Sequence, residues 1–346
     1  MSEADAKAQG LLAIIGKEID DAYMAELKKL VLHQECIDKY GKELKIVYTP
    51  LHGTGNIPAR RILRELGFEN VYVVPEQELP DGNFPTVSYP NPESPKAFEL
   101  ALKLAKEVDA DIVLATDPDA DRLGVYAKDT KTGEYVSFTG NMSGMLIAEY
   151  ILREKKANGT LPANGALVET IVTTDMAKAI AKAYGVKLIE VLTGFKYIGE
   201  QIKFFEQQNS YEYVFGLEES YGCLAGTYAR DKDACVAVMM LCEVAAWCKS
   251  NGITLWDDML SLYGKYGYYK EGLETMTLKG MDGAEKIQSM MNEMRNNPPK
   301  KIGAWDVLAL RDYKKDTRTD MTSGEVTPTG LCLLYTSPSP RDLSTS

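Results

Sequence analysis

The sequence has no Cys-x-x-Cys pair, no excess of basic residues and no apolar run long enough to cross a bilayer. Its six cysteines are scattered, which indicates reduced thiols rather than a zinc site or a disulfide framework. A formal net charge of −11 argues against a general nucleic-acid surface. The longest apolar run, Ala234–Cys248, is interrupted by Glu243 and is too short for a membrane span, and no secretory leader is visible. These absences predict a cytoplasmic protein without a nucleic-acid or membrane partner.

What is present is the composition of an ordinary globular protein. The chain holds 346 residues, of which 45% are hydrophobic and 26% charged, and this length suits two or three domains. Strand-like and helix-like segments alternate over residues 43–138 and again over residues 139–270. The alternation predicts an α/β fold: two consecutive α/β layer domains, each a mixed sheet with helices on both faces, with partial domains on either side.

Other segments carry more local predictions. Apolar residues at three- and four-residue steps predict one helix within residues 2–31, and Met142–Lys155 is predicted to be an amphipathic helix. The last fifteen residues, 332–346, are rich in Ser, Thr and Pro and are predicted to be a disordered tail. A further small α+β unit is predicted to begin after residue 270, with a strand at Leu273–Leu278, a helix near Ala284–Arg295 and strands near Trp305–Leu310.

The most informative stretch is Asp117-Pro-Asp-Ala-Asp-Arg122, a loop between two predicted strands. Three carboxylates within five residues repel one another unless a cation lies among them. Their alternate spacing can direct Asp117, Asp119 and Asp121 at one centre, and hard oxygen ligands suit Mg2+. Arg122 could then hold an anionic group beside the metal, and phosphate fits the guanidinium fork. A solvated acidic turn, favoured by Pro118, is the alternative.

Two other interpretations of this acidic loop fit less well. An EF-hand requires glycine at loop position six and glutamate at position twelve, where this chain has Arg122 and Lys128. A phosphatase with an aspartyl nucleophile also begins with Asp-x-Asp after a strand. In that class, threonine or valine would be expected in place of Asp121.

Turns from a strand into a helix supply a second kind of candidate site. Backbone amides near Gly53 and Gly55 could bind an anion, or these glycines could only permit a tight turn. His52, in the same turn, is a weak candidate for a group that supports the metal loop. Thr193 and Gly194 occupy an equivalent turn, which again suits an anion or a hydroxyl group.

Two further segments carry groups that suit a phosphorylated sugar. Glu218 and Ser220 follow a predicted strand and could hydrogen-bond vicinal hydroxyls, with a solvated turn as the alternative. The segment Arg230-Asp-Lys-Asp233 opens a long, mostly apolar helix. Its arginine and Lys232 could face a phosphate, or could pair with the neighbouring aspartates at the surface.

Five of these segments, taken in order, resemble the α-D-phosphohexomutase superfamily, and most closely its bacterial phosphoglucomutase/phosphomannomutase type. They are the TPLHGTGN turn, the ATDPDADRLGV loop, the LTGFKYIG turn, the FGLEESYG loop and the RDKD helix start. The resemblance runs from about residue 10 to 331. It implies four domains around one cleft, and transfer of a phosphate between the 1- and 6-positions of a hexose through a bisphosphorylated intermediate.

The resemblance also implies roles for individual residues. Asp117, Asp119 and Asp121 would bind Mg2+, and Arg122 and Lys232 would take part in catalysis. The implied substrates are glucose 1-phosphate and glucose 6-phosphate, or the mannose equivalents, with hexose 1,6-bisphosphate between them. The residues implied to hold them are Asp121, Arg122, Thr193, Gly194, Glu218, Ser220 and Lys232.

The departures from the family pattern are equally informative. The Ser-His-Asn-Pro loop that carries the family's phosphoserine is absent, as is its Arg-x-Ser-Gly-Thr phosphate clamp. We therefore expect a fragment, truncated at both ends, that binds Mg2+ weakly and has no mutase turnover by itself. A stand-alone sugar-phosphate binding module and a Mg-dependent phosphatase with an Asp nucleophile are the alternatives. The expected divisions are a first-domain remnant (1–42), a metal-binding α/β domain (43–138), a sugar-binding α/β domain (139–270), an incomplete C-terminal phosphate-binding domain (271–331) and a foreign, adapter-derived tail (332–346).

Overall fold

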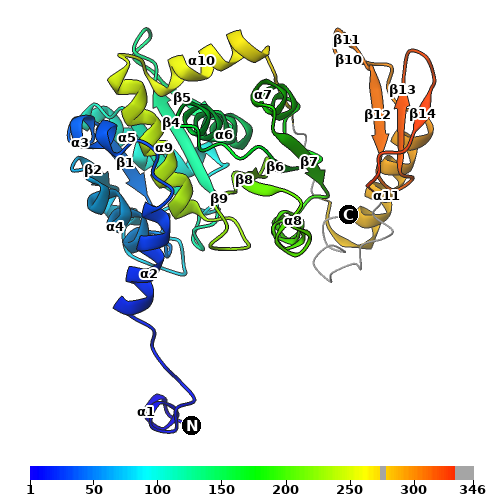
Figure 1. Ribbon diagram of the computed structural model, residues 1–346. Helices are drawn as coiled ribbons and strands as arrows, with labels where there is room; N and C mark the ends of the chain where they lie inside the picture. Colours follow the sequence, from blue (N-terminus) through cyan, green and yellow to red (C-terminus); the bar gives the residue numbers. More distant parts are fainter. Residues whose placement is uncertain (273–277, 332–346) are drawn as a thin grey trace. The chain divides into compact units, whose positions relative to one another are not determined.

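A computed structural model describes residues 1–272 and 278–331 of the chain, which forms two compact units, Met1–Tyr269 and Lys270–Ser346. Figure 1 labels the helices and strands of both units. The helices of the first unit are α1 (Glu3–Ala8), α2 (Lys17–Lys28), α3 (Gln34–Tyr40), α4 (Asn56–Leu66), α5 (Glu99–Val108), α6 (Gly140–Ala157), α7 (Met176–Tyr184), α8 (Phe195–Gln208), α9 (Ala234–Ser250) and α10 (Leu255–Tyr266), with 3-10 turns η1 (Pro75–Gln77) and η2 (Pro95–Phe98).

The first sheet has five strands in the order β2-β1-β3-β4-β5. Strands β1, β2 and β3 run parallel, whereas β4 and β5 are antiparallel to their neighbours, so the sheet is mixed. Every residue of β1 and β3 is buried, as expected of parallel strands covered on both faces. The acidic loop connects β3 to β4. The strand bounds are β1 (Ile46–Thr49), β2 (Val71–Val73), β3 (Ile112–Thr116), β4 (Leu123–Lys128) and β5 (Tyr135–Phe138).

The second sheet has four strands in the order β7-β6-β8-β9. Strand β6 pairs in parallel with β7 and β8, and β9 is antiparallel to β8. The β8–β9 connection contains Glu218 and Ser220. In both sheets, therefore, the hairpin that follows the parallel strands carries predicted site residues. The bounds are β6 (Gly165–Thr170), β7 (Lys187–Val191), β8 (Glu212–Leu217) and β9 (Cys223–Ala225).

One buried apolar cluster joins the two sheets. Helix α9 follows the second sheet in sequence, yet it contacts α3, α4 and strands β3 and β4 of the first sheet as well as α6 and β9 (Figure 1). The outer faces close separately, with α5 over the first sheet and α8 over the second. The predicted fold class is confirmed: two consecutive α/β layers with mixed sheets and helices on both faces.

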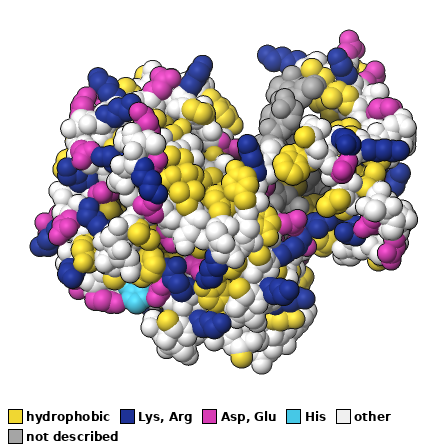
Figure 2. All heavy atoms as spheres, turned by 90° about the horizontal axis from the view of Figure 1, so that it is seen from above, with side chains coloured by type: hydrophobic (Ala, Val, Ile, Leu, Met, Phe, Trp, Pro, Cys, Tyr) yellow, Lys and Arg dark blue, Asp and Glu magenta, His cyan; other side chains and the backbone are white. Residues whose placement is uncertain are grey.

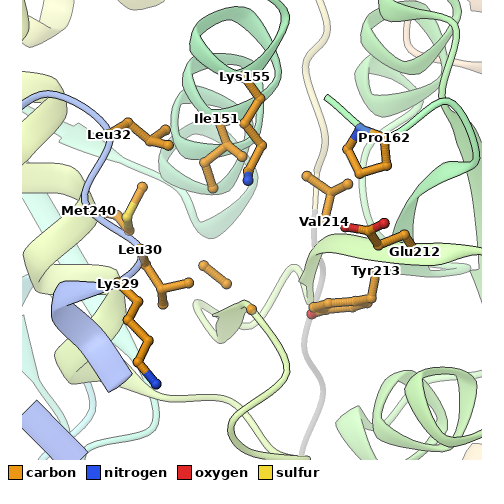
Figure 3. Close-up of a pocket in the computed structure, with 12 residues that line it drawn as sticks. Lys29, Leu30, Leu32, Ile151, Lys155, Pro162, Glu212, Tyr213, Val214 and Met240 are labelled. Atoms are coloured by element: carbon orange, nitrogen blue, oxygen red, sulfur yellow. The ribbon is translucent and has the colours of Figure 1, made fainter. Parts of the chain in front are cut away.

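The chain that follows α2 lines a small cavity. Its volume is about 90 Å³, and Figure 3 shows Leu30 and Leu32 facing residues of α6 and β8 across it, with Met240 of α9 beside Leu30. Leu30 also approaches Gly226, where an added Cβ would lie 2.8 Å from the leucine Cδ2. None of the predicted site residues lines this cavity. The contact between Leu30 and Gly226 has a structural role, because it fixes the end of α2 against the segment that follows β9.

The second unit is smaller and has little buried surface among the described residues. Gly283 is the only buried residue of α11. The predicted helix and strands of this region correspond to α11, β11 and β12, whereas the predicted strand at Leu273–Leu278 lies almost entirely outside the described residues, as does the predicted tail, 332–346. The elements are α11 (Gly280–Asn296), the hairpin β10 (Lys301–Ile302) with β11 (Trp305–Asp306), and an antiparallel sheet of β12 (Ala309–Asp312), β13 (Thr317–Asp320) and β14 (Val326–Thr327).

One local prediction is wrong, and a second is right about the helix but wrong about its amphipathic character. The single helix predicted within residues 2–31 is two helices, α1 and α2, because the chain leaves the helical path near Gly10, which has φ +68°. The helix predicted as amphipathic from Met142 begins at Gly140, where the Thr139 side chain caps it. That helix, α6, is buried on nearly every side because it lies in the cluster shared by the two sheets. Neither β9 nor α10 is among the predicted elements.

The helices, cysteines and surface charges of the structure can be set against the expectations drawn from composition. No single helix in residues 1–272 and 278–331 is long and apolar enough to cross a membrane, and α9 with α10 meets those criteria only as a pair bent by 87°. The five described cysteines form no disulfide, and four of them are buried. Figure 2 shows basic and acidic side chains interspersed over the visible face.

Candidate active site

The acidic loop starts at the end of β3, where the parallel strands β1 and β3 both present their carboxyl ends. Asp117 Oδ1 accepts hydrogen bonds from the backbone amides of Asp121 at 3.0 Å and Arg122 at 2.9 Å, which curls the loop around this carboxylate. Ala120 has φ +58°, a left-handed conformation that completes the turn. One oxygen from each of Asp117, Asp119 and Asp121 lies within 4.8 Å of the other two. The three carboxylates are gathered as their spacing predicts.

The electrostatics of the loop favour a bound cation. Asp117 is only 7% exposed. Burial, reinforced by the charges of Asp121 and Asp119, raises the pKa of Asp117 from 3.8 to about 7, although the backbone hydrogen bond from Arg122 opposes the shift. A cation among the oxygens relieves both the burial of charge and the repulsion. Three carboxylate oxygens are hard ligands, so the donor set fits Mg2+.

A second trio of potential ligands lies elsewhere in the first unit. His33, Glu35 and Cys36 also bring ligand atoms within 4.8 Å of one another. The imidazole of His33 is already engaged on both sides, by Glu35 and by Glu154. In the acidic loop, by contrast, Asp119 forms no hydrogen bond or ion pair among the described residues, and the cations near Asp117 and Asp121 lie at 3.3 Å or more.

The turn between β1 and α4 packs against the acidic loop and hydrogen-bonds to it. Thr54 donates to the carbonyl oxygen of Pro118 through both its backbone amide, at 2.8 Å, and its hydroxyl, at 3.0 Å. At Gly53 an added Cβ would lie 2.3 Å from Pro118 Cα, so only glycine permits this approach. His52 is turned to the other side, where its ring bonds to Leu79 O and the Thr86 hydroxyl. This turn supports the acidic loop through its backbone, and His52 does not contact that loop.

Arg122 is held among three carboxylates. Its Nη1 donates to Glu93 Oε1 at 2.7 Å, and its Nε lies 3.6 Å from Asp117 Oδ2 and 3.7 Å from Asp121 Oδ1. Burial alone would lower the pKa of Arg122, but the charges of Glu93 and Asp117 outweigh it and raise that pKa. Glu93 is a site residue that the sequence did not indicate, because it follows a Pro- and Asn-rich loop with no recognisable ligand pattern.

Lys232 joins the acidic loop to the β8–β9 loop, which carries Glu218 and Ser220. Its Nζ lies 3.3 Å from Asp121 Oδ2 and 3.5 Å from Glu218 Oε2. Burial would lower the pKa of Lys232, but the charges of Glu218 and Asp121 raise it, so the side chain is a cation. At Gly222 an added Cβ would lie 2.3 Å from Lys232 Cδ, so the lysine stem crosses the loop where there is no side chain. The local sequence left the partners of Lys232 open, and the structure gives it one partner in a loop of each sheet.

Glu218 is the buried group of the β8–β9 loop, with 4% of its surface exposed. Burial raises the pKa of Glu218, while the charge of Lys232 and a hydrogen bond from the Gly194 backbone amide pull it down. The predicted pair of turns, one carrying Gly194 and the other Glu218, is therefore brought together. Thr193 is exposed and Ser220 half-buried, and neither side chain makes a hydrogen bond among the described residues.

Backbone hydrogen bonds tie the two loops into one site. Leu123 N donates to Tyr221 O at 2.9 Å, and Ala234 N donates to Ala120 O at 3.0 Å. Arg230 does not reach this centre, because its guanidinium pairs with Glu206 at 2.6 Å. The result is a polar surface built from the hairpins of both sheets, with one acidic cluster, two cations and one buried carboxylate.

Comparisons with known proteins cover most of the chain. The family model described as phosphoglucomutase/phosphomannomutase, alpha/beta/alpha domain II, matches residues 21–132, and that of domain III matches residues 139–266. The phosphoglucomutase of Staphylococcus epidermidis (strain ATCC 12228) is 35% identical over 318 residues, which cover 92% of this chain and 56% of that protein. That of Staphylococcus aureus (strain N315) is 34% identical over 317 residues, with 89% and 55% covered. The chain spans about half the length of the curated relatives it matches.

Solved structures agree in fold. Parafusin from Paramecium, a phosphoglucomutase in an open form, has a TM-score of 0.57 at 19% identity, with 89% of this chain and 51% of that chain covered. A phosphoglucomutase/phosphomannomutase family protein from Burkholderia thailandensis has a TM-score of 0.50 at 22% identity, with 65% and 46% covered. At these identities the likeness concerns the arrangement of helices and strands alone.

Proposed function

The chain belongs to the α-D-phosphohexomutase superfamily, and from this premise we propose that it supplies the metal site and the sugar-binding loop of a hexose-phosphate mutase. The reaction moves a phosphoryl group between the 1- and 6-positions of a hexose, glucose or mannose. The proposal extends from the family to this chain the reaction, the substrates and Mg2+. It concerns the centre formed by the acidic loop, Lys232 and Glu218.

The observation that carries the proposal is the position of Lys232. Its ammonium group lies within 3.5 Å of both Asp121 in the acidic loop and Glu218 in the β8–β9 loop, which we call the sugar loop. A cation held between a metal ligand and a hydroxyl acceptor is well placed to contact a phosphate on the sugar that Glu218 binds. The alternatives considered for these segments, solvated turns and surface ion pairs, do not require the two loops to share one lysine.

Each residue has a physical task in this proposal. Asp117, Asp119 and Asp121 hold Mg2+, which, when bound, neutralises negative charge on the transferring phosphoryl group. Arg122 and Lys232 bind phosphate oxygens from two sides. Arg122 is kept in place by Glu93, so its guanidinium is oriented before the substrate arrives. Phosphoryl transfer depends mainly on positioning and charge, and these residues supply both.

The sugar loop fits a substrate that must bind in two orientations. Glu218 is a charged acceptor, and Ser220 and Thr193 offer hydroxyl groups that are not engaged elsewhere among the described residues. Vicinal hydroxyls of a hexose present similar donor pairs in both orientations, so a loop that recognises hydroxyls accepts either. We propose glucose phosphates, and also mannose phosphates, as substrates.

The proposal is tested by calorimetric titration of the 346-residue chain with MgCl2 and with glucose 1,6-bisphosphate. We expect each ligand to bind more tightly when the other is present, and by the same factor. We expect no interconversion of glucose 1-phosphate and glucose 6-phosphate by this chain alone, because its sequence contains no Ser-His-Asn-Pro loop. Bisphosphate binding that is absent, or indifferent to Mg2+, would contradict the proposal.

The same titration has a defined pH dependence. A protonated Asp117 cannot ligate Mg2+, and the pKa of Asp117 is raised to about 7. Protons and metal therefore compete, and lowering the pH from 8 to 6 should weaken Mg2+ binding about tenfold. An affinity that is unchanged between these pH values would show that Asp117 is not a ligand.

A further inference from the structure

The residue after Lys232 is anchored more firmly than any helix cap requires. Asp233 is the N-cap of α9, and its Oδ1 accepts from the backbone amides of Cys235 at 2.7 Å and Val236 at 3.3 Å. Its Oδ2 accepts from two phenols, Tyr23 at 2.6 Å and Tyr228 at 2.5 Å. A cap alone uses one oxygen. The second oxygen serves the two tyrosines, and they form what we call the Asp233 clamp: Tyr23, Tyr228 and Asp233.

The clamp fixes the backbone from which Lys232 extends. The amide of Asp233 donates to Cys223 O at 2.9 Å, and the amide of Ala234 donates to Ala120 O in the acidic loop at 3.0 Å. The lysine backbone is thus bound on its C-terminal side to the sugar hairpin and to the metal loop. A long lysine side chain loses much rotamer freedom when its ammonium is localised. When the backbone at Lys232 is already fixed, less conformational entropy of the lysine remains to be lost on ligand binding.

Tyr23 reaches this point from a distant part of the chain. It lies on α2, 210 residues before Asp233. The end of α2 is itself fixed, because Leu30 packs against Gly226 beside the cavity drawn in Figure 3. The rings of Tyr23 and Tyr228 lie 6.1 Å apart, so the two phenols converge on one oxygen from different elements. Burial, with the nearby charge of Asp233, raises the pKa of both phenols, so both remain donors at neutral pH.

We propose that Tyr23 and Tyr228 are positioning residues for Lys232, and that they hold its ammonium group between the metal loop and the sugar loop through Asp233. This inference rests on the proposed function, because it assigns Lys232 to the binding of a sugar phosphate. Neither tyrosine touches the centre itself. Their effect on the ligand passes entirely through the position of the lysine.

The test is a double-mutant cycle on the affinity for glucose 1,6-bisphosphate in the presence of Mg2+. Tyr23→Phe removes one hydroxyl and keeps the ring, and it should weaken binding about tenfold in the parent chain. In a Lys232→Met background the same substitution should change affinity by less than about twofold, because no ammonium remains to be positioned. Tyr135→Phe is the matched control. It removes a phenol that donates to Ala105 O and Ala110 O, and it should leave affinity unchanged.

The outcomes separate this inference from the function on which it rests. If the parent chain binds no bisphosphate, both are overturned. If the parent binds and Tyr23→Phe binds equally well, or loses the same factor with and without Lys232, only the positioning role is overturned. A loss of affinity on Tyr23→Phe that occurs only when Lys232 is present supports the positioning role. Should Tyr23→Phe fail to fold, Tyr228→Phe, which removes the other hydroxyl from the same oxygen, takes its place in the cycle.

Discussion

Replacing Asp117 with asparagine should weaken Mg2+ binding about a hundredfold while making the metal-free protein more stable. The amide oxygen can still accept the hydrogen bonds that Asp121 and Arg122 give to Asp117 Oδ1, so the loop keeps its shape. What is lost is one negative ligand. What is relieved is the burial of a charge beside two other carboxylates. A residue with a purely structural role would not be expected to lower Mg2+ affinity and raise the stability of the metal-free protein when it is replaced.

The gain in stability has its own pH dependence. The pKa of Asp117 rises from 3.8 to about 7 on folding, so the folded protein holds this proton more tightly than the unfolded chain does. The stability that this group provides is complete below pH 3.8 and is lost as the pH rises through 7. The asparagine variant does not titrate. Its advantage in free energy of unfolding should grow from near zero at pH 4 to about 4 kcal/mol at pH 8.

Urea denaturation with and without MgCl2 measures both effects. The parent chain should gain stability from Mg2+, and the Asp117→Asn chain should gain almost none. Glu107→Gln is the charge-matched control, because it removes one exposed carboxylate from α5, and it should leave both quantities unchanged. An Asp117→Asn chain that is less stable than the parent without metal at pH 8 would contradict the assigned electrostatics.

Lys232→Met is expected to weaken the binding of glucose 1,6-bisphosphate about a hundredfold. The methionine fills the space of the stem but leaves Asp121 and Glu218 without their common cation. Glu218 is 4% exposed, so its uncompensated charge should also cost about 3 kcal/mol of stability. Two separable effects, one on binding and one on folding, are therefore predicted for one substitution.

A second substitution separates these effects. Adding Glu218→Gln to Lys232→Met removes the orphaned charge and should restore most of the free energy of unfolding, but not the affinity for the bisphosphate. Lys249→Met is the control, because Lys249 pairs with Asp111 at the same 3.3 Å but at the opposite end of β3. Calorimetry on these chains should show weak binding only where Lys232 is absent. Full affinity of the double variant for the bisphosphate would show that Lys232 does not bind this ligand.

Much of the fold could be predicted because its signals are local. Alternating strands and helices, and apolar strands such as β1 and β3, are visible in short windows. The gathering of Asp117, Asp119 and Asp121 could also be predicted, because alternate spacing in a five-residue loop leaves few other arrangements. The single helix predicted within residues 2–31 is wrong for the complementary reason: the apolar period continues across Gly10, where the backbone turns.

The remaining features depend on contacts between distant segments. Lys232 finds its partners on two hairpins, Glu93 reaches Arg122 from another loop, and Tyr23 meets Asp233 across 210 residues. Local pattern cannot indicate such pairs, because the two partners of each lie on different segments of the chain that only the tertiary fold brings together. The burial of α6 on nearly every side has the same origin. The roles assigned to the site residues, Thr193 and Ser220 included, stay predictions.

The most direct measurement is an anomalous difference map from crystals of the chain grown with MnCl2 and glucose 1,6-bisphosphate. Mn2+ takes the place of Mg2+ and can be located without reference to the protein atoms. We predict one strong peak about 2.1 Å from an oxygen of each of Asp117, Asp119 and Asp121, with a phosphate within hydrogen-bonding distance of Lys232. A peak at His33, Glu35 and Cys36 instead, or a sugar phosphate bound away from Lys232 and Glu218, would contradict the account.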